Sequence, residues 1–147
     1  MAGKETHGNK YRKVNDYDIK KLSLTSESGD EIDIRMMFVQ FHVFEDIYAN
    51  NISGVVVLRD ALNLVNNLPI NGRERLSFSF ITPGHPDSKA VSKTCTVYKI
   101  DEFVRSGGQR TQAYKLFFTS DEKFVNEKTK VSKSYTGKIS TMVEDIM

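Results

Sequence analysis

The amino-acid sequence predicts an α+β domain that is rich in β-structure: a mostly antiparallel barrel or strongly curved sheet with short helices. Several stretches alternate apolar and polar residues with a period of two, which is typical of half-buried strands. Turn residues separate these stretches, most clearly at Asn71-Gly72 and Gly107-Gly108. The composition is that of an ordinary globular domain leaning toward β-structure, with 39% hydrophobic and 27% charged residues, 9 Phe and 6 Tyr.

The chain is long enough for one domain. With 147 residues, a domain of this size buries about 68 to 70% of its unfolded surface, so it needs neither a disulfide nor a metal for stability. We divide it into three parts. Residues 1–18 are expected to form a flexible basic arm, residues 19–138 the β-barrel domain, and residues 139–147 the start of an amphipathic helix that leads into a further domain.

The first strands follow the arm. Leu22 and Leu24 belong to one strand, and Ser26–Asp30 supplies a turn. A long strand is then expected from Glu31 to about Phe44, and its pattern changes phase part-way. In the first half of this strand, Ile32 and Ile34 alternate with charged residues at odd-numbered positions. In the second half, the odd-numbered positions are apolar instead.

The residues of this second apolar face are Met37, Val39, Phe41 and Val43. Either a bulge near Met37 re-aims the side chains, or the far half of the strand is covered on both faces. Three covers remain open, namely neighbouring subunits, a missing domain and the chain's own short helices. The four residues are therefore the candidate subunit interface.

The next segment combines strand, helix and turn. An apolar strand from Ile52 ends at Asp60, whose carboxylate is placed to cap a helix over Ala61–Leu68. Pro69 and the Asn71-Gly72 pair end this helix, and Gly72 is expected to take a positive φ. A half-buried strand follows, with Leu76, Phe78 and Phe80 on its inner face.

The C-terminal part begins with a β-hairpin. Strands over Lys93–Val104 and Arg110–Thr119 flank a turn in which Gly107 and Gly108 supply the positive φ of a tight hairpin. One packed face is expected to hold Tyr98, Ile100, Tyr114, Leu116 and Phe118. A helix is expected to start at Ser120–Glu122, and the last helix starts at Ile139.

The sequence offers no convergent set of catalytic residues, so we expect no enzyme, no metal and no cofactor. His7, His42 and His85 lack the spacing of a zinc site. Glu45-Asp46 and Asp101-Glu102 could be acid–base pairs, but adjacent residues on a strand point to opposite faces, which favours solvated charge. Cys95 lies in a strand pattern that suits a buried, unreactive thiol.

The charge pattern gives little pull toward membranes or nucleic acid. The formal net charge is +2, and no apolar stretch approaches the roughly 18 residues of a membrane span. Two basic clusters could touch phosphates: Lys10, Arg12 and Lys13, and Lys128, Lys130, Lys133 and Lys138. Acidic neighbours and few aromatic residues favour solvated loops instead.

The order of these parts resembles the N-terminal region of the central baseplate hub proteins of contractile-tailed bacteriophages. The resemblance covers roughly Ile19 to Met147 and is carried by FEDIYANNISG, the strand closed by Asp60, the short helix with Asn63, Leu64 and Leu68, and LPINGRE. It implies a barrel of the tail-tube type. It also implies a structural, non-enzymatic subunit that forms the ring joining the tail tube to the central spike.

The same resemblance implies the partners. The chain would bind itself in a ring, as a trimer with pseudo-sixfold symmetry, and would contact tail tube subunits, the central spike protein and other baseplate proteins. Nucleic acid would only pass through the lumen. The implied location is the baseplate of the virion tail, after synthesis in the host cytoplasm. Hub proteins of this kind are usually longer and continue into further domains.

Two other classes of function remain open. One is a small β-barrel module that binds single-stranded nucleic acid or carbohydrate, and it would show as salt-dependent binding of oligonucleotides. The other is a hydrolase whose catalytic domain lies elsewhere in a longer protein. Ring formation would separate the hub interpretation from both.

Overall fold

The structure is a computed structural model that describes residues 17–68, 70–82, 89–105, 111–130, 132 and 134–146. Residues 1–16, which make up most of the expected basic arm, lie outside the described part. The strands are β1 (Asp18–Thr25), β2 (Glu31–Asp33), β3 (Phe38–Phe44), β4 (Ser53–Asp60), β5 (Arg75–Ile81), β6 (Val91–Arg105) and β7 (Gln112–Thr119). The helices are α1 (Leu64–Asn67), α2 (Asp121–Lys128) and α3 (Ile139–Ile146).

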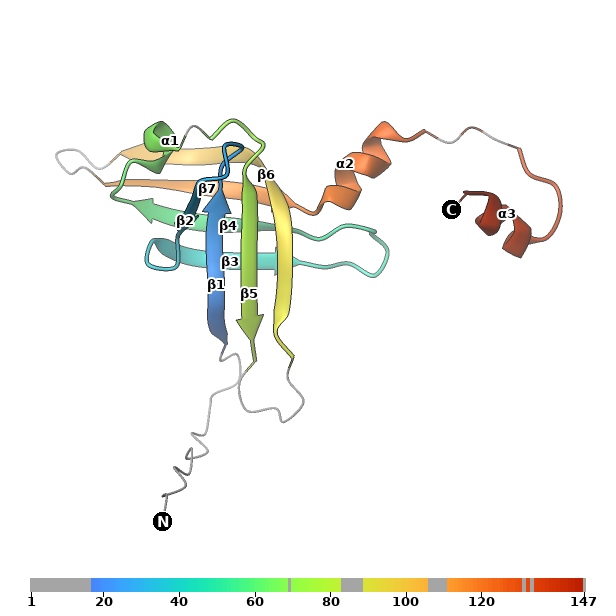
Figure 1. The fold of residues 1–147 in the computed structure, drawn as a ribbon, viewed down its shortest axis with the longest axis horizontal. Coiled ribbons are helices and arrows are strands. Elements are labelled where there is room, and N and C mark those ends of the chain that lie inside the picture. The colour runs from blue at the N-terminus through green and yellow to red at the C-terminus, as the bar shows by residue number, and fades with distance from the viewer. Residues whose placement is uncertain are drawn as a thin grey trace, which may run out of the picture.

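All seven strands form one antiparallel sheet in the order β2-β1-β5-β6-β7-β4-β3. The sheet curls into a half-barrel, so that β1 and β5 cross β3, β4 and β7 in Figure 1. This confirms the predicted class, a β-rich α+β domain with a strongly curved antiparallel sheet. In this order, β2 and β3 are the two edge strands.

Strand β6 connects the two halves of the curled sheet. It has 15 residues and pairs with β5 over its first part and with β7 over its second. The pairing with β7 shifts between Val97 and Lys99 and again between Asp101 and Val104, and such bulges let a strand bend. The first shift corrects one expectation, because Tyr98 is 43% exposed and does not join the packed face.

The core lies inside the curl. Its buried residues are Leu22, Leu24, Ile34, Val56, Leu58, Leu64, Leu68, Leu76, Phe78, Cys95, Val97, Tyr114, Leu116 and Phe118. In β4 the buried positions alternate with half-buried ones as far as Leu58. Gly54 is one of the buried positions, and a Cβ there would come within 2.3 Å of both the His42 carbonyl oxygen and the Phe118 ring. Only glycine fits this approach without displacing its neighbours.

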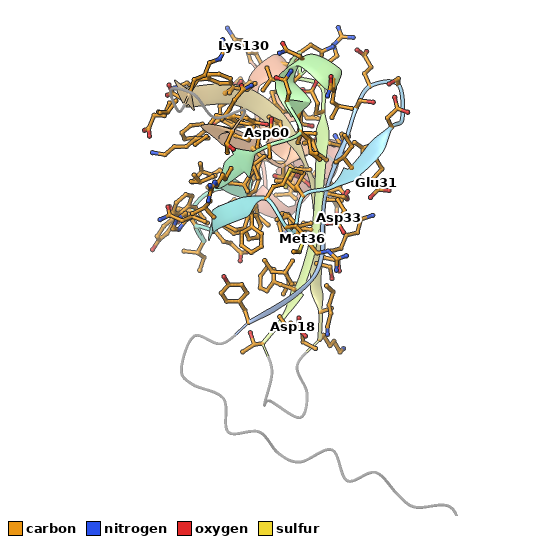
Figure 2. All side chains as sticks on the ribbon, turned by 90° about the vertical axis from the view of Figure 1, so that its left-hand side faces the viewer. Asp18, Glu31, Asp33, Met36, Asp60 and Lys130 are labelled. Carbon is orange, nitrogen blue, oxygen red and sulfur yellow. The ribbon has the colours of Figure 1, made fainter. Side chains whose placement is uncertain are left out.

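The expected long strand over residues 31–44 is wrong in one respect, because a turn divides it into β2 and β3. The amides of Met37 and Phe38 both donate to the carbonyl of Ile34, at 3.0 and 3.1 Å. Met36 lies in this turn and is 96% exposed (Figure 2). The turn therefore joins the two edge strands of the sheet, and it accounts for the phase change in the sequence.

The helices partly match their expected positions. Helix α1 has only 4 residues, Leu64–Asn67, and not the expected span Ala61–Leu68. Asn63 takes a left-handed φ of 56° just before it, which Asn tolerates better than most residues and which prevents an earlier start. Helices α2 and α3 begin at Asp121 and Ile139, as the sequence predicts.

Candidate functional site

Asp60 caps the segment that follows β4, as the sequence predicts. Its side chain is fully buried. Oδ1 accepts a hydrogen bond from the Leu62 amide at 2.8 Å, and Oδ2 accepts one from the Leu64 amide at 2.7 Å. The Tyr114 hydroxyl also donates to Oδ2, at 3.1 Å. Burial, with a further contribution from Asp60, raises the pKa of Tyr114 well above its usual range, so its hydroxyl stays a donor.

The Asn71-Gly72 turn contains a residue that the sequence analysis missed. Gly72 has the expected positive φ, 92°. Behind it, Glu74 is fully buried and accepts the amides of Asn71 and Gly72 at 2.6 and 2.9 Å. The carboxylate thus holds the turn from inside. In the sequence, the signal for this contact was a glutamate two positions after an Asn-Gly pair.

Three of the expected turn residues cannot be compared with the structure. Pro69, Gly107 and Gly108 lie outside the described residues.

The four residues of the candidate interface do not share one face. Met37, Phe41 and Val43 are half-buried and pack against the core, whereas Val39 is 59% exposed. Two features separate them, the turn at residues 34–37 and a bulge in β3 between Phe38 and Gln40. The bulge alternative is therefore confirmed: the four side chains do not share one face, and the chain's own core strands cover three of them.

Phe41 shows this cover most clearly. Its ring lies 5.1 Å from that of Phe78, edge to face, and 5.9 Å from that of Phe118. Aromatic pairs at these distances stabilise a core beyond the area they bury. Strands β5 and β7 therefore cover the Phe41 side chain. The short helices, which were one expected cover, do not provide these contacts.

Strand β3 keeps one free edge among the described residues. The Ser120 amide donates to the Ile52 carbonyl at 2.8 Å, and successive residues of a strand bond to alternate sides. The backbone N–H and C=O groups of even-numbered residues in β4 therefore point toward β7. Those of Val55 point toward β3. Val55 lies opposite His42, so the backbone groups of Val43 point to the free edge.

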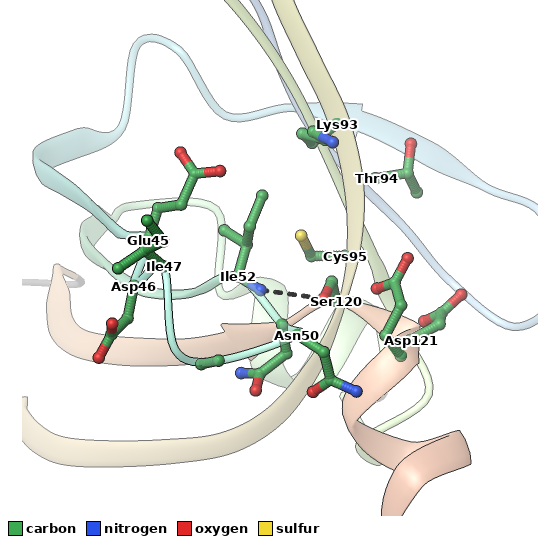
Figure 3. Close-up of a pocket in the computed structure, with 13 residues that line it drawn as sticks. Glu45, Asp46, Ile47, Asn50, Ile52, Lys93, Thr94, Cys95, Ser120 and Asp121 are labelled. Atoms are coloured by element: carbon green, nitrogen blue, oxygen red, sulfur yellow. Dashed lines mark hydrogen bonds between the residues drawn. The ribbon is translucent and has the colours of Figure 1, made fainter. Parts of the chain in front are cut away.

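A cleft lies where the β3–β4 loop meets the end of β7 and the start of α2. Its volume is about 540 Å³. Figure 3 shows Glu45 and Ile47 on one side of the cleft and Lys93, Cys95 and Asp121 on the other. The Ser120 hydroxyl accepts the Ile52 amide at 3.1 Å, which fixes the base of the loop.

The chemistry of this cleft favours fixed charge over proton transfer. Arg75 bonds both oxygens of Asp121, at 2.6 and 2.7 Å, and it lowers the pKa of that carboxyl. A hydrogen bond with Ser120 lowers the pKa of Glu122. A general acid needs a raised carboxyl pKa. Burial raises the pKa of the Cys95 thiol, whereas a nucleophilic cysteine needs a lowered one.

Neither acidic pair from the sequence forms a convergent site. Figure 3 shows Glu45 and Asp46 with their carboxyl groups pointing in different directions, and Asp46 is engaged by the Tyr48 amide at 2.9 Å. Asp101 and Glu102 each bond a lysine, Lys99 and Lys115, both at 2.6 Å. Asp46, Asp101 and Glu102 thus make local contacts within the fold.

In the part of the chain that the structure describes, no group of three or more His, Cys, Asp and Glu residues is arranged to hold a metal ion. His42 lies exposed on β3, and the other two histidines are outside the described residues. No helix in that part is long and apolar enough to cross a membrane. No protein-family model, no curated protein and no solved structure matches the chain.

Proposed function

We propose that this chain is a non-enzymatic structural subunit of a phage tail baseplate hub, forming a ring that joins the tail tube to the central spike. The proposal rests on the resemblance of the segment from FEDIYANNISG to LPINGRE. It also rests on one observation of the structure, the free edge of β3. A curled sheet with an open edge can pair with the edge of a neighbouring copy and so continue the sheet from subunit to subunit.

The mechanism would be geometric. Copies placed side by side around an axis make heterologous contacts that close into a ring. By the family resemblance the ring would be a trimer, with the tail tube above it, the spike below it and other baseplate proteins around it. It would stand at the virion baseplate after assembly in the host cytoplasm, and nucleic acid would only pass through its lumen.

The test removes one backbone donor from the free edge. In Val43→Pro the strand loses an outward N–H, and proline is tolerated at such edge positions. Val43→Ala is the matched control, because it shortens the same side chain but keeps the N–H. We expect rings in negative-stain images of the full-length protein and of Val43→Ala, and folded monomers for Val43→Pro. Rings of Val43→Pro as abundant as those of the control would contradict pairing through this edge.

One observation supports a second candidate function, the binding of single-stranded nucleic acid. On the outer face of the sheet the rings of Tyr98 and Phe117 lie 6.4 Å apart. Lys99 lies over the Phe117 ring at 5.2 Å, and Lys123 lies over the Tyr98 ring at 5.4 Å. Aromatic rings beside lysines are typical of surfaces that stack single-stranded nucleic acid. Salt-dependent oligonucleotide binding that Tyr98→Ala weakens would favour this candidate.

A further inference from the structure

The loop between β3 and β4 carries two neighbouring apolar side chains that are almost fully exposed. Ile47 is 90% exposed and Tyr48 is 95% exposed. Asp46 shapes the turn that presents them, since its Oδ1 accepts the Tyr48 amide at 2.9 Å and its carbonyl accepts the Ala49 amide at 3.0 Å. A tyrosine beside an isoleucine on a shaped turn has the composition of an interface anchor. We call this pair the loop tip.

A groove of about 340 Å³ lies at the opposite end of the same strands. Apolar side chains line it from four strands: Val39, Val57, Val104 and Ala113. In Figure 1 the β3–β4 loop lies at the right, whereas the end of β4 and the start of β7 lie at the left. We call this site the outer groove. Its volume is near the lower end of the roughly 300–1,000 Å³ of ligand pockets, which suits one or two inserted side chains.

The two sites carry opposite charge. The loop tip follows Glu45 and Asp46, and the sequence from Phe38 to Leu58 contains no Lys or Arg. The outer groove is lined by Arg59, and this arginine is exposed. Complementary charges at the rim of an interface steer association and fix its orientation.

We propose that the loop tip of one copy inserts into the outer groove of the next copy. The two sites lie at opposite ends of the same strands, so the contact is head-to-tail and links copies end to end. It differs from the free edge of β3, which would pair copies side by side. The inference rests on the proposed function in so far as the chain assembles with itself. It adds a second contact between copies, end to end, and names the residues that form it.

The test measures end-to-end association of the full chain by sedimentation velocity. Ile47→Ser with Tyr48→Ser removes the anchor, and Val104→Glu places a charge in the groove. All three positions are exposed, so circular dichroism should stay unchanged. We expect each variant to weaken association about 30-fold, as loss of a hot spot does. The control Val125→Ser changes an equally exposed valine outside both sites and should associate like the wild type.

Charge reversal tests the pairing itself. Glu45→Lys and Arg59→Glu should each weaken association alone, because like charges then meet at the rim. In a mixture of the two variants, every tip can meet a groove of opposite charge, so association should return. Failure of the mixture to recover would overturn the proposed pairing.

A photo-crosslinking residue in place of Tyr48 identifies the occupant. We expect crosslinks to peptides that contain Val57 or Val104 of another copy. Helix α3 also exposes an apolar face, with Ile139 78% and Val143 48% exposed, and crosslinks to this helix would overturn the inference. Rings that form but never associate end to end would overturn it and leave the proposed function standing. A wild-type chain that stays monomeric would overturn both.

Discussion

The Tyr114 hydroxyl donates to Oδ2 of Asp60 at 3.1 Å across 54 positions of the sequence. The same carboxylate receives two backbone amides. This contact ties β7 to the end of β4 at the point where the chain leaves the sheet. One buried carboxylate therefore satisfies a side chain and a turn at once.

Asp60→Ala should lower the free energy of unfolding by about 3 kcal/mol or more, because each buried donor left unsatisfied costs about 1 to 3 kcal/mol. Urea titration measures the change. Asp60→Asn keeps one acceptor oxygen and should cost less. Asp101→Ala, which breaks an exposed ion pair with Lys99 and an exposed hydrogen bond from the Glu102 amide, should shift the midpoint far less than Asp60→Ala. An Asp60→Ala variant as stable as Asp101→Ala would contradict the role of the cap.

Alkaline pH should destabilise the wild type more than Tyr114→Phe. Because the pKa of Tyr114 is raised in the folded state, the unfolded chain loses this proton first. The contribution is complete below the unfolded pKa of about 10 and falls above it by up to about 1.4 kcal/mol per pH unit. Unfolding midpoints between pH 9 and 11, roughly the range around that pKa, measure the difference. Parallel curves for the two proteins would contradict it.

Glu74→Gln should destabilise the Asn71-Gly72 turn. A glutamine has one acceptor oxygen for two amides and would direct a donor at one of them, at a cost of about 2 kcal/mol. Arg73→Ala, which breaks an exposed pair with Glu27, is the neighbouring control and should show no measurable change. Thermal unfolding of both variants decides the point, and equal melting temperatures would count against the buried carboxylate.

Gly72→Val should cost about 1 to 3 kcal/mol, because a β-branched residue strongly disfavours a positive φ. Among the described residues other than Asn71 and Arg73, no atom lies within 4 Å of where its Cβ would stand, so the cost is one of backbone conformation and not of a clash. Gly72→Asn should cost less, since Asn visits this region more readily. If both variants unfold at the wild-type urea concentration, the strain argument fails.

Phe41→Asp and Val39→Asp should behave differently although they lie two positions apart. Phe41 packs against Phe78 and Phe118, so a charge there should unfold the domain at a cost of several kcal/mol. Val39 is exposed, so its variant should remain folded. Circular dichroism and light scattering compare the two, and a folded Phe41→Asp would show that this face of β3 is not part of the core.

The sequence was sufficient where a pattern is local. Period-two alternation located Leu76 and Phe78 in the core, and capping chemistry identified Asp60. It was insufficient where a pairing partner decides the outcome. An apolar run such as Met36–Val39 reads equally well as a continuous strand or as a turn at a sheet edge, and the bulge at Tyr98 depends on its register with β7. Glu74 was missed because a buried carboxylate cannot be told from a solvated one before its amide partners are known.

The strand order also sets how the domain reaches its fold. Ile52 and Ser120, which meet at the start of the β4–β7 pairing, are 68 positions apart. Strand β1 pairs with β5 on its inner side, so this pairing forms only after β5 is in place. Sheets built from such distant pairings fold in milliseconds to seconds, slower than helical bundles, because loop closure precedes the contacts that compensate it. During that interval the apolar run of β3 is exposed without its cover. The domain is therefore most prone to aggregate while it folds, before β5 and β7 cover that run.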